Sequence, residues 1–123
     1  MESTRYQNGL ETLNAITAST GAAVVEGLRD IAPDLADWII EFAYGDVFSR
    51  QDLDLRTRQL ATVAALTAMG TAAAQLKVHI AGALNVGCSR DEIIAVILQM
   101  AVYAGFPAAI NGVAAAREAF GHR

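Results

Sequence analysis

A long uncharged segment in the second half of the chain most strongly constrains how this protein can fold. No charged residue occurs from Ile93 to Ala116. About 20 apolar residues are enough to span a bilayer as a helix. Gly105 and Pro107 interrupt this segment, however, and proline breaks a helix interior because it has no N–H to donate. We therefore expect two buried helices joined by a tight turn, not a membrane span.

The whole chain has the pattern of helices, because alanine is abundant and no alternating strand pattern exceeds a few residues. Ser89 and Glu92 have the spacing of a capping box, which marks a helix start. Gly70 and Gly87 are placed to end helices, and Pro33 is placed to begin one. We predict an all-α, single-domain bundle over residues 1–123 with about six to seven helices. Their expected ranges are 5–16, 22–31, 33 to about 45, 54–69, 72–86, 89–104 and 107–120.

The composition predicts self-association. Apolar residues make up 54% of the 123 residues and charged residues only 18%. A domain of this size leaves about a third of its unfolded surface exposed, so it cannot hide that much apolar area alone. The simplest solution is a symmetric homo-oligomer that buries apolar helix faces.

Charge and cysteine content exclude several classes of protein. The net charge is −4, and the nine Lys and Arg residues form no basic run, so we expect no nucleic-acid binding. The single cysteine, Cys88, excludes an intrachain disulfide, a CxxC redox pair and a thiolate zinc cluster. His79 and His122 lack metal-ligand spacing, so no metal is expected; His122, near the chain end, is given no role. The first ten residues do not resemble a signal peptide, and we expect a cytoplasmic protein.

His79 is the first candidate for chemistry. It lies in an apolar helix of small residues, on a face shared with Gln75 and Leu76. An imidazole with a pKa near 6.5 can donate or accept a proton at neutral pH. A lone histidine on such a face is more often structural, so the residue alone is weak support for a function.

Glu41 and two arginines are further candidates. Glu41 lies among bulky apolar residues but on the face of Asp34 and Asp37, opposite an apolar stripe that includes Trp38 and Phe42. Burial would raise its pKa, whereas a solvated position would not. Arg56 and Arg58 occupy the first turn of a predicted helix, where a positive charge is locally unfavourable. They predict either an acidic side-chain partner or a ligand carboxylate.

The corner formed by Tyr103, Phe106 and Pro107 is rigid and aromatic. It can line a pocket or close the core, and we expect the core. Cys88 follows a turn, where it can be exposed, but no neighbouring histidine or second cysteine activates it.

In their order and spacing, several motifs resemble the carboxymuconolactone decarboxylase family along almost the whole chain. They are RYxxGL from Arg5, FAYGDVFSR from Phe42, LDLRTR from Leu53, His79 with ALNxG from Ala83, DEII from Asp91, Gln99, and YAGFPAA from Tyr103. The resemblance implies an all-helical fold like that of alkylhydroperoxidase D, assembled as a trimer or hexamer. One branch of the family uses a CxxC pair ahead of the histidine. Here Ala72 and Gln75 stand at those positions, so dithiol peroxidase activity is not expected.

The resemblance instead implies a cofactor-independent decarboxylase of aromatic catabolism, acting on a carboxylated lactone or similar small acid. In that reading His79 donates a proton or stabilises an enolate, and Arg58 or Arg56 anchors a carboxylate. Glu41 orients the substrate or accepts a proton. The substrate pocket is shaped by Tyr103 and Phe106.

Gln75 departs from the family pattern, because decarboxylases of this family commonly carry a glutamate in the turn before the histidine. A glutamine can orient an imidazole but cannot relay a proton. Two alternatives therefore stay open. One is an isomerase or cyclase using acid/base chemistry in a biosynthetic pathway, and the other is a non-catalytic oligomer that binds a small acid.

Overall fold

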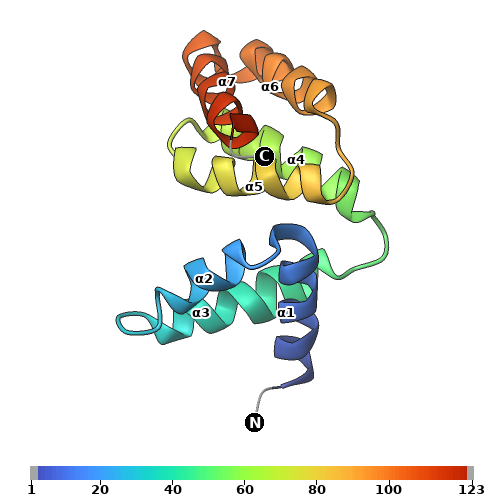
Figure 1. Cartoon of the computed structure of the whole chain (residues 1–123), viewed down its shortest axis with the longest axis vertical. Helices are drawn as coiled ribbons and strands as arrows, with labels where there is room; N and C mark the ends of the chain where they lie inside the picture. The colour runs from blue at the N-terminus through green and yellow to red at the C-terminus, as the bar shows by residue number, and fades with distance from the viewer. Residues whose placement is uncertain (1–2, 122–123) are drawn as a thin grey trace. The chain divides into compact units, whose positions relative to one another are not determined.

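The computed structural model describes residues 3–121, and His122 lies outside them. Within residues 3–121 the chain forms seven α-helices and one π-helix, with no strand, which confirms the predicted all-α class (Figure 1). The helices are α1 (Thr4–Thr17), α2 (Thr20–Glu26), α3 (Pro33–Trp38), η1 (Ile39–Phe48), α4 (Leu55–Met69), α5 (Ala73–Asn85), α6 (Arg90–Ala104) and α7 (Phe106–Gly121).

These helices divide into two compact units, with the boundary after Leu55. The N-terminal unit holds α1, α2, α3 and η1, and the C-terminal unit holds nearly all of α4 together with α5, α6 and α7. The predicted single domain over residues 1–123 stays a prediction.

Two glycines allow α1 and η1 of the N-terminal unit to cross at short range. A Cβ atom on Gly9 would overlap the backbone carbonyl of Ile40, and one on Gly45 would lie 2.6 Å from the carbonyl oxygen of Arg5. Only a residue without a side chain fits either position. The crossing is also tied at the surface, where Arg5 Nη2 lies 2.8 Å from Asp46 Oδ2.

The third helix differs from its prediction, since we expected it to weaken at Gly45. It continues without a break from α3 into η1 and reaches Phe48. Gly45 lies inside the helix and does not end it. Its lack of a side chain allows the close contact with α1. The second helix also differs from the predicted 22–31: α2 starts at Thr20 and ends at Glu26.

The buried face of α3 and η1 is formed by Ala36, Ile40 and Tyr44. The apolar stripe noted in the sequence lies largely outside it: Trp38 is 63% exposed and Phe42 60% exposed. Burial raises the pKa of Tyr44 to about 12, so this phenol is neutral at any physiological pH.

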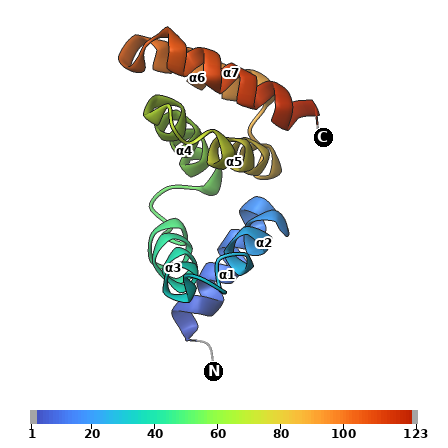
Figure 2. The same ribbon diagram turned by 90° about the vertical axis from the view of Figure 1, so that its left-hand side faces the viewer.

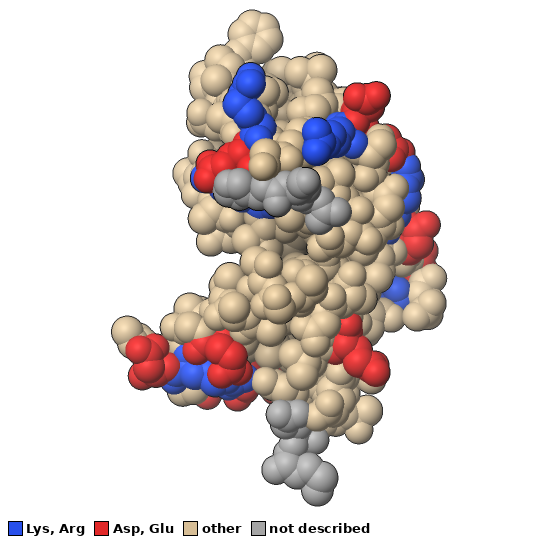
Figure 3. Space-filling model, viewed as in Figure 1, with Lys and Arg blue, Asp and Glu red and all other residues tan. Residues whose placement is uncertain are grey.

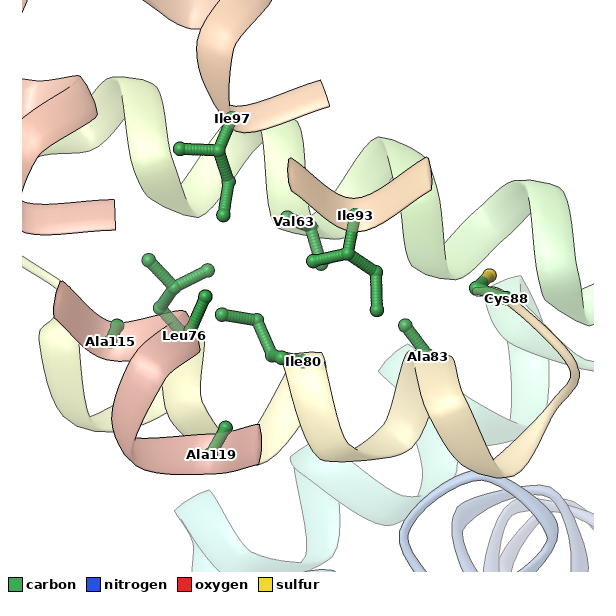
Figure 4. Close-up of a cluster of buried hydrophobic side chains, with 10 residues drawn as sticks. Val63, Leu76, Ile80, Ala83, Cys88, Ile93, Ile97, Ala115 and Ala119 are labelled. Carbon is green, nitrogen blue, oxygen red and sulfur yellow. The ribbon is translucent and has the colours of Figure 1, made fainter. Parts of the chain in front are cut away.

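The C-terminal unit is held together by one apolar cluster to which all four of its helices contribute (Figure 4). Its members are Val63 of α4; Leu76, Ile80 and Ala83 of α5; Cys88; Ile93 and Ile97 of α6; and Ala115, Ala116 and Ala119 of α7. The ribbon views agree in placing α6 beside α7, the two helices predicted from the uncharged segment (Figure 2). Among the helices of residues 3–121, none has the combined length and hydropathy that spanning a bilayer requires.

The ends of these helices follow the sequence closely. The capping box is present: the Ser89 hydroxyl accepts from the Glu92 N–H at 3.0 Å, and the Glu92 carboxylate accepts from the Ser89 N–H at 2.8 Å. Gly70, Gly87 and Gly105 have φ values of 73°, 103° and 93°, a conformation that side chains disfavour. These residues explain why the predicted ends of α4, α5 and α6 agree with the structure to within one residue.

We predict that Gly9→Ala destabilises the protein, although alanine is intrinsically the better helix former. The added methyl group would force α1 away from η1, and overpacking of this kind typically costs about 1–3 kcal/mol. Urea unfolding followed by circular dichroism measures the change. Gly121→Ala is the control, because nothing lies within 4 Å of its added Cβ. Equal unfolding midpoints for the two variants would contradict the close crossing.

Candidate active site

The central feature of the candidate site is a contact between the side chains of Gln59 and His79. Gln59 comes from α4 and His79 from α5, and the amide oxygen Oε1 lies 3.1 Å from imidazole Nδ1. Gln59 is fully buried, with no exposed surface, whereas His79 is half-buried. The imidazole is therefore anchored at one nitrogen by a group that solvent does not reach.

The surroundings of His79 favour its neutral form. Burial removes the imidazole from water and lowers its pKa below the ordinary value of 6.5. The contacting group, an amide, carries no charge that would offset this effect. At pH 7 the ring is therefore mainly neutral, with Nε2 as the nitrogen that Gln59 does not contact.

The two candidate arginines lie in the first turn of α4, as predicted, but in different settings. Arg56 forms an ion pair with Glu92 of α6, the same carboxylate that completes the capping box. Of the two partners expected for Arg56, an acidic side chain or a ligand carboxylate, the structure therefore shows the acidic side chain. Arg58 is half-buried and directly precedes Gln59, so the backbone that presents the amide to His79 also carries this guanidinium.

Three of the predicted site residues are exposed. Gln75, one turn before His79, faces solvent, and the amide that contacts the imidazole is that of Gln59. Tyr103 is 79% exposed and Phe106 76% exposed. The expectation that these two aromatic residues close the core is wrong, because α6 and α7 turn other faces toward the apolar cluster.

Glu41 lies in the N-terminal unit, and its side chain is 24% exposed. Its carboxylate accepts a hydrogen bond from Ser3 Oγ at 2.8 Å and lies 4.0 Å from Arg5 Nη1. Both partners tie η1 to the start of α1. Its predicted catalytic role stays a prediction.

Two further expectations concern Cys88 and metals. Cys88 is buried within the apolar cluster, with Sγ 3.5 Å from the backbone oxygen of Arg56. The exposure considered for this cysteine is therefore wrong. Within residues 3–121, no group of three His, Cys, Asp or Glu side chains is placed to hold a metal ion.

A cavity of about 220 Å³ lies in the C-terminal unit, near the start of α5. It is lined mainly by alanine and glycine, with Thr67, Lys77 and Glu118 among the polar residues. Lys77 Nζ and Glu118 Oε2 form an ion pair of 2.7 Å that links α5 to α7. His79 does not line this cavity, so the cavity is a feature apart from the Gln59–His79 contact.

Comparison with known proteins identifies the family. Residues 33–118 match the model of the carboxymuconolactone decarboxylase family, a range that includes η1, His79 and most of α7. The chain belongs to this family. It is 35% identical over 117 residues to 4-carboxymuconolactone decarboxylase of Acinetobacter baylyi, a match that covers 94% of this chain and 87% of that protein.

Two more relatives illustrate the range of the family. An uncharacterized 15.0 kDa protein of Paracoccus denitrificans is 31% identical over 103 residues, covering 83% of this chain and 77% of its own length. Nitrosuccinic acid decarboxylase of Metarhizium robertsii is 36% identical over 75 residues, which covers 61% of this chain and 52% of that protein. Two of these three relatives are named decarboxylases, so this chain is related to decarboxylases with different named substrates.

Gln59 is the residue of the site that sequence reasoning missed. It follows Arg58 in a charged first turn and looks like a surface residue in the sequence. One signal was available, because Gln59, Val63 and Leu66 recur at helical spacing on α4, the pattern of a buried stripe. This spacing predicts that Gln59 is buried, but only the folded structure shows that its side chain contacts His79.

We predict that His79 makes the protein less stable in acid. Its folded-state pKa lies below that of the unfolded chain, so the unfolded chain binds more protons and the free energy of unfolding falls as pH drops below about 6.5. Replacing His79 by Asn removes this contribution, and the loss of stability between pH 7.5 and 5.5 should become smaller. Urea unfolding at several pH values measures both slopes. Identical slopes would show that His79 is not shielded from water.

Proposed function

We propose that this protein is a cofactor-independent decarboxylase of a small carboxylated lactone or related organic acid. The observation that carries the proposal is a half-buried histidine anchored by a buried amide, in a chain 35% identical to a protein named 4-carboxymuconolactone decarboxylase. The relationship to nitrosuccinic acid decarboxylase supports the reaction class more broadly.

The chemistry of such a substrate explains what the protein has to supply. When a carboxylated, conjugated lactone loses carbon dioxide, the electron pair of the broken C–C bond moves into the lactone carbonyl and forms an enolate. A proton must then be added to carbon. The protein therefore needs a group that stabilises the enolate oxygen and a group that delivers a proton. In its protonated form, His79 meets both requirements in turn through Nε2–H, on the nitrogen that Gln59 does not contact.

The substrate carboxylate also needs an anchor, and Arg58 is the proposed one. A guanidinium binds a carboxylate through two parallel hydrogen bonds, which fixes its orientation. Arg58 directly precedes Gln59 in α4, and Arg56 is the alternative anchor. Glu41, Gln75, Tyr103 and Phe106 keep their predicted supporting roles as parts of the proposal.

We predict that His79→Ala loses turnover of 4-carboxymuconolactone by about 10²–10⁴-fold, the usual contribution of a general acid or base. Ultraviolet absorbance of the lactone and release of carbon dioxide measure the reaction. His122→Ala is the matched control, because it removes the other histidine of the chain. Unchanged turnover in His79→Ala would reject the role of His79. No turnover in the folded wild type would reject this substrate.

Self-association is the second part of the proposal. Five large apolar side chains of α6 and α7 are more than half exposed: Leu98 (56%), Val102 (77%), Tyr103 (79%), Phe106 (76%) and Ile110 (66%). All belong to the segment without charged residues, so a partner surface would also have to be apolar. On the face drawn in Figure 3, most of the surface of each unit is formed by uncharged residues. A second copy of the chain supplies a surface of the required kind.

We predict that Val102→Asp reduces the molar mass measured by size-exclusion chromatography with light scattering. A carboxylate in an apolar interface is strongly unfavourable, so subunits should separate. Thr71→Asp, at an exposed position outside this surface, is the control. A wild-type protein that is already a monomer at micromolar concentration would contradict the proposal.

A further inference from the structure

The burial of Gln59 is costly to the fold and calls for an explanation. It is one of the few polar side chains with essentially no exposure, and it lies at the same level of burial as Val63, one turn further along α4. Its amide nitrogen Nε2 is buried and has no hydrogen-bond partner among the described residues. An apolar side chain of similar size would avoid this unsatisfied donor. The amide therefore opposes stability at this position, and its one polar contact is with His79.

We propose that Gln59 is a positioning residue that fixes the tautomer of His79, so that proton exchange with the substrate takes place only at Nε2. This inference rests on the proposed function, because it names the atom of His79 that carries the proton in that reaction.

The argument follows from what an amide oxygen can do. Gln59 Oε1 only accepts hydrogen bonds, so the Nδ1 atom that lies 3.1 Å away must carry a proton. In the neutral ring this leaves the lone pair on Nε2. In the protonated ring Nδ1–H still donates to Gln59, and the additional proton is on Nε2. The contact with Gln59 is therefore the same in both states, and only Nε2 changes.

The proton and electron balance of the decarboxylation agrees with this arrangement. Cleavage of the C–C bond to the carboxylate releases carbon dioxide and leaves the electron pair on the enolate. That pair then forms a C–H bond with the proton of Nε2–H, and the imidazolium returns to the neutral Nδ1–H form. Solvent restores the proton on Nε2. Gln59 holds the ring throughout but cannot take up the proton itself, because an amide neither gains nor loses a proton in this pH range.

Two of the basic side chains on α4 and α5 form ion pairs with acidic residues. Lys77 of α5 pairs with Glu118 of α7, and Arg56 of α4 pairs with Glu92 of α6. Arg58 is the next residue to Gln59 along α4. Burial is the cause of the lowered pKa of His79. A neutral amide leaves this effect in place, whereas a carboxylate at position 59 would oppose it.

Two variants of position 59 test the proposal. Gln59→Met removes the acceptor with little change in volume and creates no buried charge. We expect kcat to fall about 10- to 100-fold, a loss of the size seen when the group that orients a metal-bound histidine is removed. Gln59→Glu keeps an acceptor at the same place and adds a negative charge. It should retain the Nδ1–H form, raise the pKa of His79, and move the pH profile of kcat to higher pH.

Nitrogen-15 NMR of the imidazole provides a readout that a merely structural role would not change. The chain has only two histidines, so His122 serves as an internal reference. In the wild type we expect a neutral His79 with Nδ1 protonated, and in Gln59→Met a mixture of the two neutral tautomers. Gln51→Met, which replaces an exposed glutamine of the N-terminal unit, is the matched control and should change neither kcat nor the tautomer.

The outcomes separate this proposal from the proposed function. A wild-type His79 with Nε2 protonated in its neutral form, or an unchanged tautomer and kcat in Gln59→Met, would overturn the positioning role. A wild type that shows the expected tautomer and loses it in Gln59→Met, but does not convert the lactone, would support the positioning role and reject only the substrate.

Discussion

Close packing of neighbouring helices against glycine residues is the constraint on which both units of this structure depend. In the N-terminal unit α1 and η1 cross where Gly9 and Gly45 present no side chain. In the C-terminal unit a Cβ on Gly112 of α7 would lie 2.8 Å from Ile97 of α6 and 2.9 Å from Thr67 of α4. Dispersion contacts are strong only at short range. Small residues at these positions let the helices approach closely, and the short distances strengthen the contacts between them.

This way of packing has a consequence for the surface. Because alanine and glycine fill much of the contact between helices, several of the largest apolar side chains remain outside the buried faces. Trp38 and Phe42 in one unit, and Val102, Tyr103 and Phe106 in the other, are all more than half exposed. The apolar excess in the composition therefore lies on the surface of the single chain. The proposed self-association would bury part of it.

The same packing isolates the candidate site. Gln59 belongs to the same buried face of α4 as Val63, which is a member of the apolar cluster. In such surroundings a polar contact is strong when it is satisfied and costly when it is not. The Gln59 amide oxygen is satisfied by its hydrogen bond with His79, whereas the buried amide N–H without a partner remains destabilising. If catalysis requires proton exchange at Nε2 of His79, the orienting role of Gln59 explains why this destabilising amide is present.

The helical class, most helix ends in the second half of the chain, and the choice of His79 as the central candidate could be predicted from the sequence alone. These depend on local chemistry: glycines at positive φ, a capping box between Ser89 and Glu92, and an imidazole among small residues.

The sequence did not show which side chains lie in contact with one another. The partner of His79 proved to be Gln59, twenty positions earlier, and not Gln75 on the same helix. Likewise Arg56 forms an ion pair with Glu92, and Gly45 lies where η1 crosses α1 and not at a helix end. These contacts could be seen only in the folded chain, because each depends on which face of one helix lies against another.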